Sequence, residues 1–279
     1  MTEIILNDTV HVSGGRVGAS GHVFSETDLL NMAPNDTSIV AKTVGHGSFV
    51  VRDGDIRRAQ RTVGVSGWTF GGSVWDARER FAELCQWPEG HVTLRLVADG
   101  LDVECTGVWD ISRREIDAAE ISWSATLTCE SPYLISHDEQ TIFLKSQASS
   151  TGGLSWGLAW PLDWGDGGLD GNSGRIRNAG NAVGGPVVTV HGDFPDGVTL
   201  MDSKGRSLVF DGPVLSGAPL TLDCRPGRRL AISSGVNRSH LLSVREWFTV
   251  PAGGDLTVSF LPHTPGDGWA QVSMRDYWL

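Results

Sequence analysis

Hydrophobic and polar residues alternate strictly along the segment AEISWSATLTCE. The apolar positions are Ile121, Trp123, Ala125, Leu127 and Cys129. Because successive side chains of a β-strand point to opposite faces of its sheet, this pattern predicts a strand with one buried face. The preceding segment HVTLRLVADGLDVECTGVWD predicts a β-hairpin with Asp99-Gly100 as its two-residue turn.

A helical period marks the segment from Ser73 to Trp87. Apolar residues recur there three or four positions apart, which predicts an amphipathic α-helix. They are Val74, Ala77, Phe81, Leu84 and Cys85. Ser73 is the expected N-cap, Asp76 follows three residues later, and Pro88 ends the pattern. A shorter helix is expected to begin at Ser25, in SETDLLNM.

The pattern changes after Tyr133, where a polar and then Ser/Gly-rich stretch reads as a linker. We therefore expect a first domain over residues 1–134, a linker with a Trp-rich strap over 135–171, and a second domain over 172–279. The second domain contains eight short strand-like segments with turn residues about every 8–12 positions, which favours a β-sandwich. They are PVVTVHG, GVTLMDS, RSLVF, LTLDC, RRLAISS, REWFTV, LTVSFL and WAQVSMRDYWL.

Composition supports a mainly β fold and disfavours nucleic-acid binding. The 279 residues include 36 glycines and 12 prolines, as in chains of short strands joined by turns. The formal net charge is −11, whereas a duplex-binding surface needs clustered Lys and Arg. The four cysteines form no CxxC pair, which argues against a zinc site. We expect no signal peptide and no membrane span, and synthesis in a cytoplasm with free thiols.

Candidate catalytic and metal sites are weak. The sequence contains no GxxxxGK[ST], HExxH or GxSxG motif, and its eight histidines are scattered. We expect no enzyme activity, no cofactor and no metal. Two alternatives stay open: the oxygens of Asp163, Asp166, Asp170 and Asn172 suit either calcium or ordinary turns, and Trp156, Trp160 and Trp164 suit either sugar stacking or packing.

Several segments, in order along the chain, resemble the distal tail proteins of long-tailed, non-contractile bacteriophages. RTVGVSG before the helix, CESPYL at the end of the first domain and NAGNAVGGPVVTVHG at the start of the second resemble family motifs, although Ser131 stands where the family has an acid. SWGLAWPLDWG resembles the linker of members from phages of actinobacteria. The matching residues are Arg61, Val63, Val65, Gly67, Pro132, Tyr133, Asn178, Gly180, Pro186, Gly192, Asp223, Pro251, Gly253, Arg275 and Trp278.

The resemblance implies a structural protein of the virion, located at the phage tail tip. Its first domain would be a tail-tube-like β-sandwich with one flanking helix, and its second a galectin-like β-sandwich. Six copies would form a ring that contacts the tail tube protein, the tape-measure protein and the tail-associated hub protein. DNA would pass through the ring without specific binding. Candidate channel residues are the charged turns of the first domain, Asp53, Asp55, Glu115, Asp117 and Glu120.

Other interpretations of the same residues remain. The chain could be a lectin-like module that binds the host surface, through the Trp-rich strap or the second sandwich. It could also be another minor tail protein of similar fold. A glycosidase is disfavoured because no pair of carboxylates stands out in the sequence.

Overall fold

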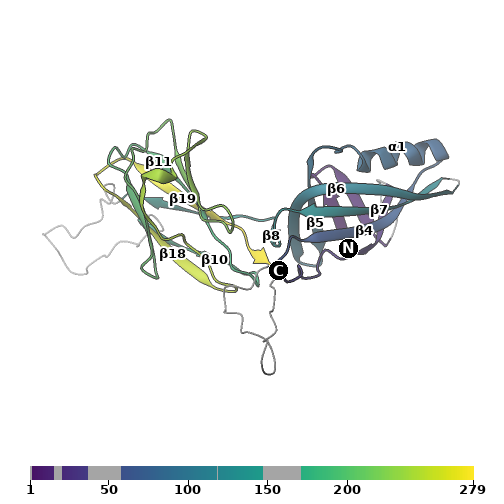
Figure 1. Ribbon diagram of the computed structural model, residues 1–279, viewed down its shortest axis with the longest axis horizontal. Coiled ribbons are helices and arrows are strands. Elements are labelled where there is room, and N and C mark those ends of the chain that lie inside the picture. Colours follow the sequence, from purple (N-terminus) through teal and green to yellow (C-terminus); the bar gives the residue numbers. More distant parts are fainter. Residues whose placement is uncertain (1, 16–20, 37–57, 118, 147–170) are drawn as a thin grey trace, which may run out of the picture. The chain divides into compact units, whose positions relative to one another are not determined.

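The computed structural model describes residues 2–15, 21–36, 58–117, 119–146 and 171–279 (Figure 1). The chain divides into two compact units: unit 1 comprises residues 1–137 and 278–279, and unit 2 comprises residues 138–277. Strands dominate both units, so the predicted mainly β fold is confirmed. The single α-helix in the described ranges is too short to cross a membrane.

Unit 1 is built on one sheet that closes on itself. The strand order is β20-β8-β6-β5-β1-β2-β3-β4-β7, and β6 also pairs with β7. The bounds are β1 Glu3–Leu6, β2 Val10–Gly14, β3 His22–Thr27, β4 Thr62–Phe70, β5 His91–Ala98, β6 Leu101–Asp117, β7 Glu120–Cys129, β8 Leu134–Ser136 and β20 Tyr277–Trp278. All the pairings with a given register are antiparallel except the short contact between β2 and β3.

The 17-residue strand β6 makes the closure possible. Its first half pairs with β5, from Ala98↔Leu101 to His91↔Val108, and its second half pairs with β7 up to Asp117↔Glu120. The predicted hairpin turn is confirmed, because Asp99 and Gly100 both have positive φ, 23° and 87°. One strand thus joins two sides of the sheet.

The core of unit 1 follows from the alternation of β7. Its five predicted apolar side chains are buried, and the residues between them face outward. Strand β4 alternates in the same way, with Val63, Val65 and Gly67 facing inward. Apolar side chains from the other strands complete the cluster, and Trp278 from the end of the chain packs against it.

The predicted helix is confirmed as α1, Val74–Leu84. The Ser73 hydroxyl accepts a hydrogen bond from the Asp76 backbone N–H at 3.2 Å, and the Asp76 carboxylate accepts from the Gly72 N–H at 2.6 Å. At the other end, the Trp109 indole N–H donates to the Leu84 carbonyl at 3.1 Å. The sheet therefore supplies a partner for a carbonyl that the helix cannot satisfy itself.

The buried face of α1 is narrower than predicted. Ala77 and Leu84 are buried and Phe81 packs partly against the core, but Val74 is 40% exposed and Cys85 is also exposed. The first turn of α1 is therefore stabilised by the hydrogen bonds of its N-cap and not by packing against the core. The second predicted helix, from Ser25, is wrong: Ser25 lies in β3, and Asp28 accepts the Gly64 N–H at 2.6 Å. That tertiary bond holds the segment beside β4.

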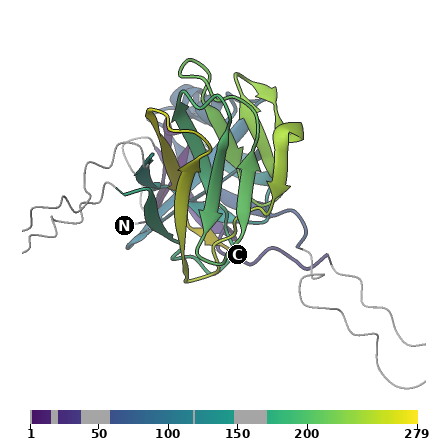
Figure 2. The same ribbon diagram turned by 90° about the vertical axis from the view of Figure 1, so that its left-hand side faces the viewer.

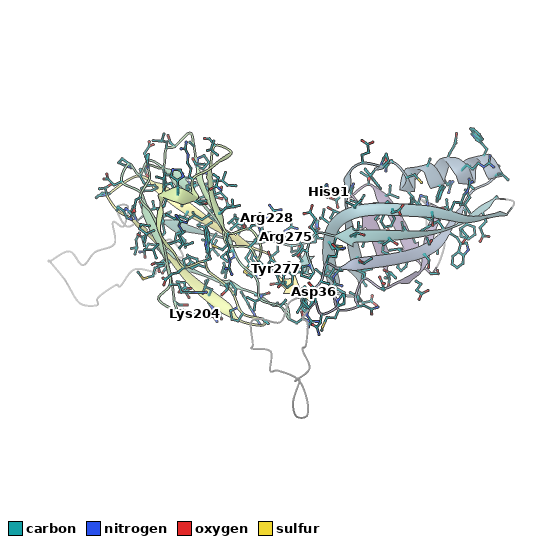
Figure 3. All side chains as sticks on the ribbon, in the orientation of Figure 1. Asp36, His91, Lys204, Arg228, Arg275 and Tyr277 are labelled. Carbon is teal, nitrogen blue, oxygen red and sulfur yellow. The ribbon has the colours of Figure 1, made fainter. Side chains whose placement is uncertain are left out.

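Unit 2 is a two-sheet sandwich (Figure 2). One sheet has the order β10-β18-β12-β13-β17, and the other β16-β15-β14-β11-β19-β9. The bounds are β9 Gln140–Lys145, β10 Ser173–Arg177, β11 Val187–Gly192, β12 Val198–Asp202, β13 Ser207–Phe210, β14 Leu220–Asp223, β15 Leu230–Ser233, β16 Val236–Asn237, β17 Leu242–Arg245, β18 Asp255–Pro262 and β19 Gly268–Met274, with the 3-10 helix η2 at Ser239–Leu241. Charged side chains such as Lys204 and Arg228 are exposed, whereas Tyr277 is buried (Figure 3).

Two segments differ from the predicted strands. Residues 140–145, assigned to the linker, form β9, which pairs with β19 from Trp269↔Lys145 to Met274↔Gln140. Leu144 is the one buried residue of β9. With so few buried positions, this edge strand shows no clear alternation of apolar and polar residues that would predict it from the sequence. Conversely, most of REWFTV lies outside a strand, because β17 ends at Arg245. The Trp-rich strap lies outside the described residues.

A buried histidine lies between the sheet and helix of unit 1. His22 on β3 is fully buried, its Nδ1 lies 3.0 Å from the Thr69 hydroxyl, and its Nε2 lies 3.3 Å from the Glu83 carboxylate on α1. Burial lowers the pKa of His22 below its ordinary value of 6.5, and the hydrogen bond to the Glu83 carboxylate opposes this change only in part. The charged Arg80 acts in the same direction as burial.

We predict that unit 1 loses stability as the pH falls below about 6.5. In that range an unfolded His22 takes up a proton more readily than the folded one, so protonation favours unfolding. His22→Gln should therefore show a smaller loss of unfolding free energy between pH 7 and pH 5, measured by urea denaturation. His91→Gln, at an exposed position, is the control. An unchanged pH dependence in His22→Gln would contradict the prediction.

Candidate functional site

The outward face of strands β4, β7 and β6 carries mainly small polar residues, together with the exposed hydrophobic side chains of Trp68 and Val108. The inward positions are filled by the core, so the residues between them form this outer face. On β4 and β7 they include Thr62, Gly64, Ser66, Ser122, Ser124, Thr126 and Thr128, and on β6 they include Asp110 and Ser112. The Ser112 hydroxyl lies 3.1 Å from that of Ser124 and 3.3 Å from the Ser124 carbonyl. Side chains of this size leave the sheet surface open to water.

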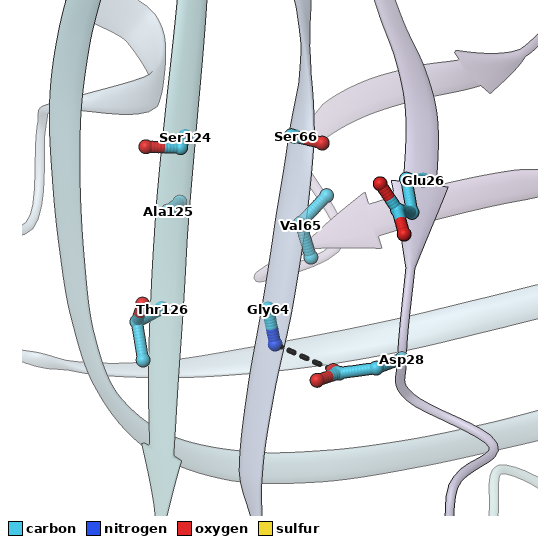
Figure 4. Close-up of a pocket in the computed structure, with 8 residues that line it drawn as sticks. All are labelled: Glu26, Asp28, Gly64, Val65, Ser66, Ser124, Ala125 and Thr126. Atoms are coloured by element: carbon cyan, nitrogen blue, oxygen red, sulfur yellow. Dashed lines mark hydrogen bonds between the residues drawn. The ribbon is translucent and has the colours of Figure 1, made fainter.

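A shallow depression of about 310 Å³ lies on this face, over β4 and between its neighbours β3 and β7 (Figure 4). Gly64, Ser66, Ser124 and Thr126 contribute to its floor, and Glu26 and Asp28 supply two carboxylates. The Gly64 N–H donates to Asp28 Oδ1 at 2.6 Å, which fixes that carboxylate against the strand. The depression is therefore polar and acidic.

The chemistry available on the outer face is electrostatic rather than catalytic. Its described charged side chains include Glu26 on the neighbouring strand β3, Asp110 on β6 and Glu120 on β7. Arg113 pairs with Trp123 and so belongs to the opposite face. No group of three potential metal ligands occurs in the part of the chain that the structure describes. An acidic, hydroxyl-lined surface repels phosphate groups and stays hydrated.

Within the described residues, the sheet that carries this face has two edges with unpaired stretches. Strand β5 pairs with β6 only up to Val108, and none of the described strands pairs with that side of β6 from Trp109 onward. On the far side, the described part of β2 pairs with β3 at Val23 and Phe24 and no further along β3. Unpaired backbone groups at such edges can bind a strand from another chain.

The first motif residue, Arg61, ties two loops that are distant in sequence to the start of β4. Its buried guanidinium donates to the carbonyls of Leu29, Asn31 and Pro132, at 2.7, 2.5 and 3.1 Å. Pro132 is itself a motif residue, far from Arg61 in sequence. Burial lowers the pKa of Arg61, and the nearby thiols of Cys105 and Cys129 oppose that change. Arg61 is thus a structural cation inside unit 1.

The adjacent thiols respond to this environment in different directions. A hydrogen bond with Cys129 and burial raise the pKa of Cys105, whereas the hydrogen bond from Cys105 lowers the pKa of Cys129, and Arg61 adds to that effect. Both side chains are buried. They belong to the core cluster and not to a reactive site.

In unit 2 the motif residues around Asn178 come together in the same manner. The Asn178 amide is fully buried and donates to the carbonyls of Ala182, Val250 and Pro251, at 2.7, 3.3 and 3.3 Å. Its Oδ1 accepts the Gly180 and Tyr277 N–H groups, each at 3.1 Å. The Gly253 N–H donates to the Gly180 carbonyl at 2.9 Å, so two distant motifs meet here.

The remaining motif residues are dispersed. Asp223 is buried and paired with Arg225, Gly192 ends β11 with φ 128°, and Pro186 precedes β11. Arg275 follows β19, and Tyr133 follows Pro132 at a partly buried position. The motif residues around Arg61 in unit 1 and around Asn178 in unit 2 form no catalytic arrangement. Their contacts hold loops together.

The candidate channel residues are only partly described. Asp53 and Asp55 lie outside the described residues, as do the candidate calcium ligands except Asn172. Glu115, Asp117 and Glu120 were expected in turns, but Glu115 and Asp117 lie in β6 and Glu120 begins β7. This expectation was wrong because β6 continues almost to the end of the hairpin. The register places Asp117 opposite Glu120.

Sequence reasoning missed the residues that define the outer face. Glu26 and Asp28 lie in a segment interpreted as a helix. Ser122, Ser124 and Thr126 were visible as the polar half of the alternating pattern, yet only the buried half was interpreted. The signal was present in the sequence, but the closure of the sheet is needed to show that these positions form one surface.

The sequence matches no protein-family model and no curated protein. Solved structures nevertheless share its fold over the whole chain. The Dit protein (gp 19.1) of phage SPP1, described as a paradigm of the hub adsorption apparatus in phages that infect Gram-positive bacteria, matches with a TM-score of 0.63 and 10% identity, covering 100% of both chains. A chain of the phage P2 baseplate in its activated conformation with Ca matches with a TM-score of 0.52 and 11% identity, covering 98% of both chains.

We predict opposite outcomes for two glycines of the RTVGVSG motif. A Cβ on Gly67 would lie 2.1 Å from the Val23 carbonyl oxygen, whereas a Cβ on Gly64 would meet nothing closer than 3.5 Å. Gly67→Ala should lower the unfolding free energy by about 1–3 kcal/mol, because the backbone must move. Gly64→Ala should change it by less than about 1 kcal/mol and stabilise if anything. Thermal and urea denaturation would check this pair, and equal effects would contradict it.

Proposed function

We propose that this chain is a distal tail protein, a structural subunit at the tip of a phage tail. The observation that carries the proposal is the likeness of the complete chain, both units included, to the SPP1 Dit protein. The sequence motifs point independently to the same family. No enzyme activity is part of this role, and the motif residues serve to hold loops together.

The open edges of unit 1 support assembly into a ring. One copy presents the outer edge of β6 beyond Val108, and the other side of the same sheet presents β3 beyond Phe24. Two different edges on one subunit make a head-to-tail contact, which closes into a ring when the rotation per subunit fits. The family resemblance gives six as the number of copies.

The outer face of β4, β7 and β6 would line the channel of this ring. When the edges pair, these strands continue from one subunit to the next, so the hydroxyl-lined face becomes one continuous surface. Unit 1 contains 19 Asp and Glu residues against 11 Lys and Arg residues. A channel of that sign would let DNA pass without adhering to the wall. Glu115, Asp117 and Glu120, with Asp53 and Asp55, remain candidates for residues that line this channel.

The proposed position also defines the partners. The ring would join the tail tube protein and the tape-measure protein on one side and the tail-associated hub protein on the other. The protein would be made in the cytoplasm of the bacterial host, an actinobacterium by the linker motif, and would reside in the virion.

We predict that Ile111→Pro prevents ring formation. The Thr106 carbonyl accepts the Glu130 N–H, so the backbone groups of Thr106 point toward the β7 side of β6. Backbone groups alternate sides along a strand, and Ile111 lies an odd number of positions from Thr106. The Ile111 N–H therefore points to the open edge and not to β7. Proline at this position removes an edge donor without removing a bond to β7. Ile111→Ala loses the same side chain but keeps the N–H, and should still assemble.

Assembly would be measured by light scattering and by electron microscopy of the purified protein. The expected result is a six-fold ring for the natural chain and for Ile111→Ala, and a folded monomer for Ile111→Pro. A natural chain that stays monomeric at high concentration, or a ring that Ile111→Pro leaves intact, would overturn the edge-pairing model.

A further inference from the structure

We propose that the outer face of the six-stranded sheet in unit 2 binds a neutral saccharide that lies across the strands. Four residues form a straight row on this face through direct pairing: Phe143 on β9, Gln271 on β19, Thr189 on β11 and Thr221 on β14. Paired residues project from the same side of a sheet. The row therefore presents an aromatic ring, an amide and two hydroxyls in line.

The alternating positions show that this row lies on the outside of the sandwich. Leu144, Ala270, Val190 and Leu222, which come from the same four strands, are at most 1% exposed. They face the core shared with the other sheet. The row between them consequently faces solvent, and Phe143 is 57% exposed.

The exposed ring of Phe143 is held in place by two further aromatic residues. Its centroid lies 5.4 Å from that of Trp269 in an edge-to-face arrangement, with 66° between the planes. Trp269 in turn stacks on His191, at 4.1 Å and 17°. An aromatic ring that is already oriented before binding offers its face to the C–H groups of a sugar at little entropic cost.

The polar members of the row are available for a ligand. Within the described residues, the side chains of Gln271, Thr189 and Thr221 form no hydrogen bond with the protein. An amide donates and accepts, as does a hydroxyl, which matches the alternating donors and acceptors of sugar hydroxyls. The row crosses three strand spacings, about 14–15 Å, so it suits two or three sugar rings.

Charge and size favour a saccharide over other ligands. None of the four residues carries a charge, and the nearby Asp223 carboxylate is already held by Arg225. The exposed Lys145, next to Phe143 on the same face of β9, is a single cation, whereas a nucleic acid needs clustered Lys and Arg. One exposed phenyl ring among polar groups is also far smaller than the apolar area that a protein interface usually buries. The site is independent of the edges proposed for ring formation, which belong to unit 1.

The test uses the full chain and neutral trisaccharides of glucose, galactose, mannose and N-acetylglucosamine. Saturation-transfer NMR would be recorded with each at about 10 mM, which detects a Kd near 1 mM. At least one trisaccharide should receive saturation from the protein. Phe143→Ala should weaken its binding at least tenfold, Gln271→Ala should weaken it several-fold, and Phe143→Tyr, which keeps the ring, should retain it.

Trp75→Ala, which removes an exposed aromatic side chain from unit 1, is the matched control and should leave binding unchanged. Circular dichroism and light scattering on each variant separate loss of binding from loss of folding or of assembly. Parallel assays with an insoluble polysaccharide of the same sugar distinguish a surface ligand from a soluble one. Absence of transfer from all four sugars, or transfer that Phe143→Ala and Gln271→Ala leave unchanged, would overturn the proposal.

Discussion

The fold of unit 1 depends on the register of one strand, β6. This strand has 17 residues and pairs with two different strands along its length. Up to about Val108 it pairs with β5, and from about that point onward it pairs with β7. Because side chains alternate with a period of two, a shift by one residue would turn the buried half of β7 toward solvent and the hydroxyl half toward the core. This one register closes the sheet. It also fixes the position of α1 and the residues that face outward.

Loops in both units are held by single buried polar side chains. Arg61 satisfies three backbone carbonyls in unit 1, and Asn178 satisfies three carbonyls and two N–H groups in unit 2. Loop backbone that is removed from water needs such partners, since an unsatisfied buried group costs about 1–3 kcal/mol. Motif residues such as Arg61 and Asn178 therefore have polar side chains because they bind loop backbone, not because they take part in chemistry.

The two units present surfaces of different character. The outer face in unit 1 combines small hydroxyls with carboxylates and, in the described ranges, has strand edges with unpaired stretches beside it. The outer face of the six-stranded sheet in unit 2 instead displays oriented aromatic rings beside unpaired amide and hydroxyl groups. The ring contact and the saccharide site that we propose therefore use different residues of the chain.

The sequence by itself determined the elements whose signal is local. The alternation in β7, the period and cap of α1, and the Asp99-Gly100 turn were all readable, because each depends on neighbours within a few residues. Most strands of unit 2 were readable for the same reason. Strand β9 and the true state of the Ser25 segment were not, because a long-range pairing with β19 and the bond from Gly64 to Asp28 decide them. Only the tertiary structure brought Arg61 to Pro132, Asn178 to Gly180 and Pro251, and Phe143 to Trp269 and His191, since contacts between distant segments depend on sheet order and register, which no local pattern encodes.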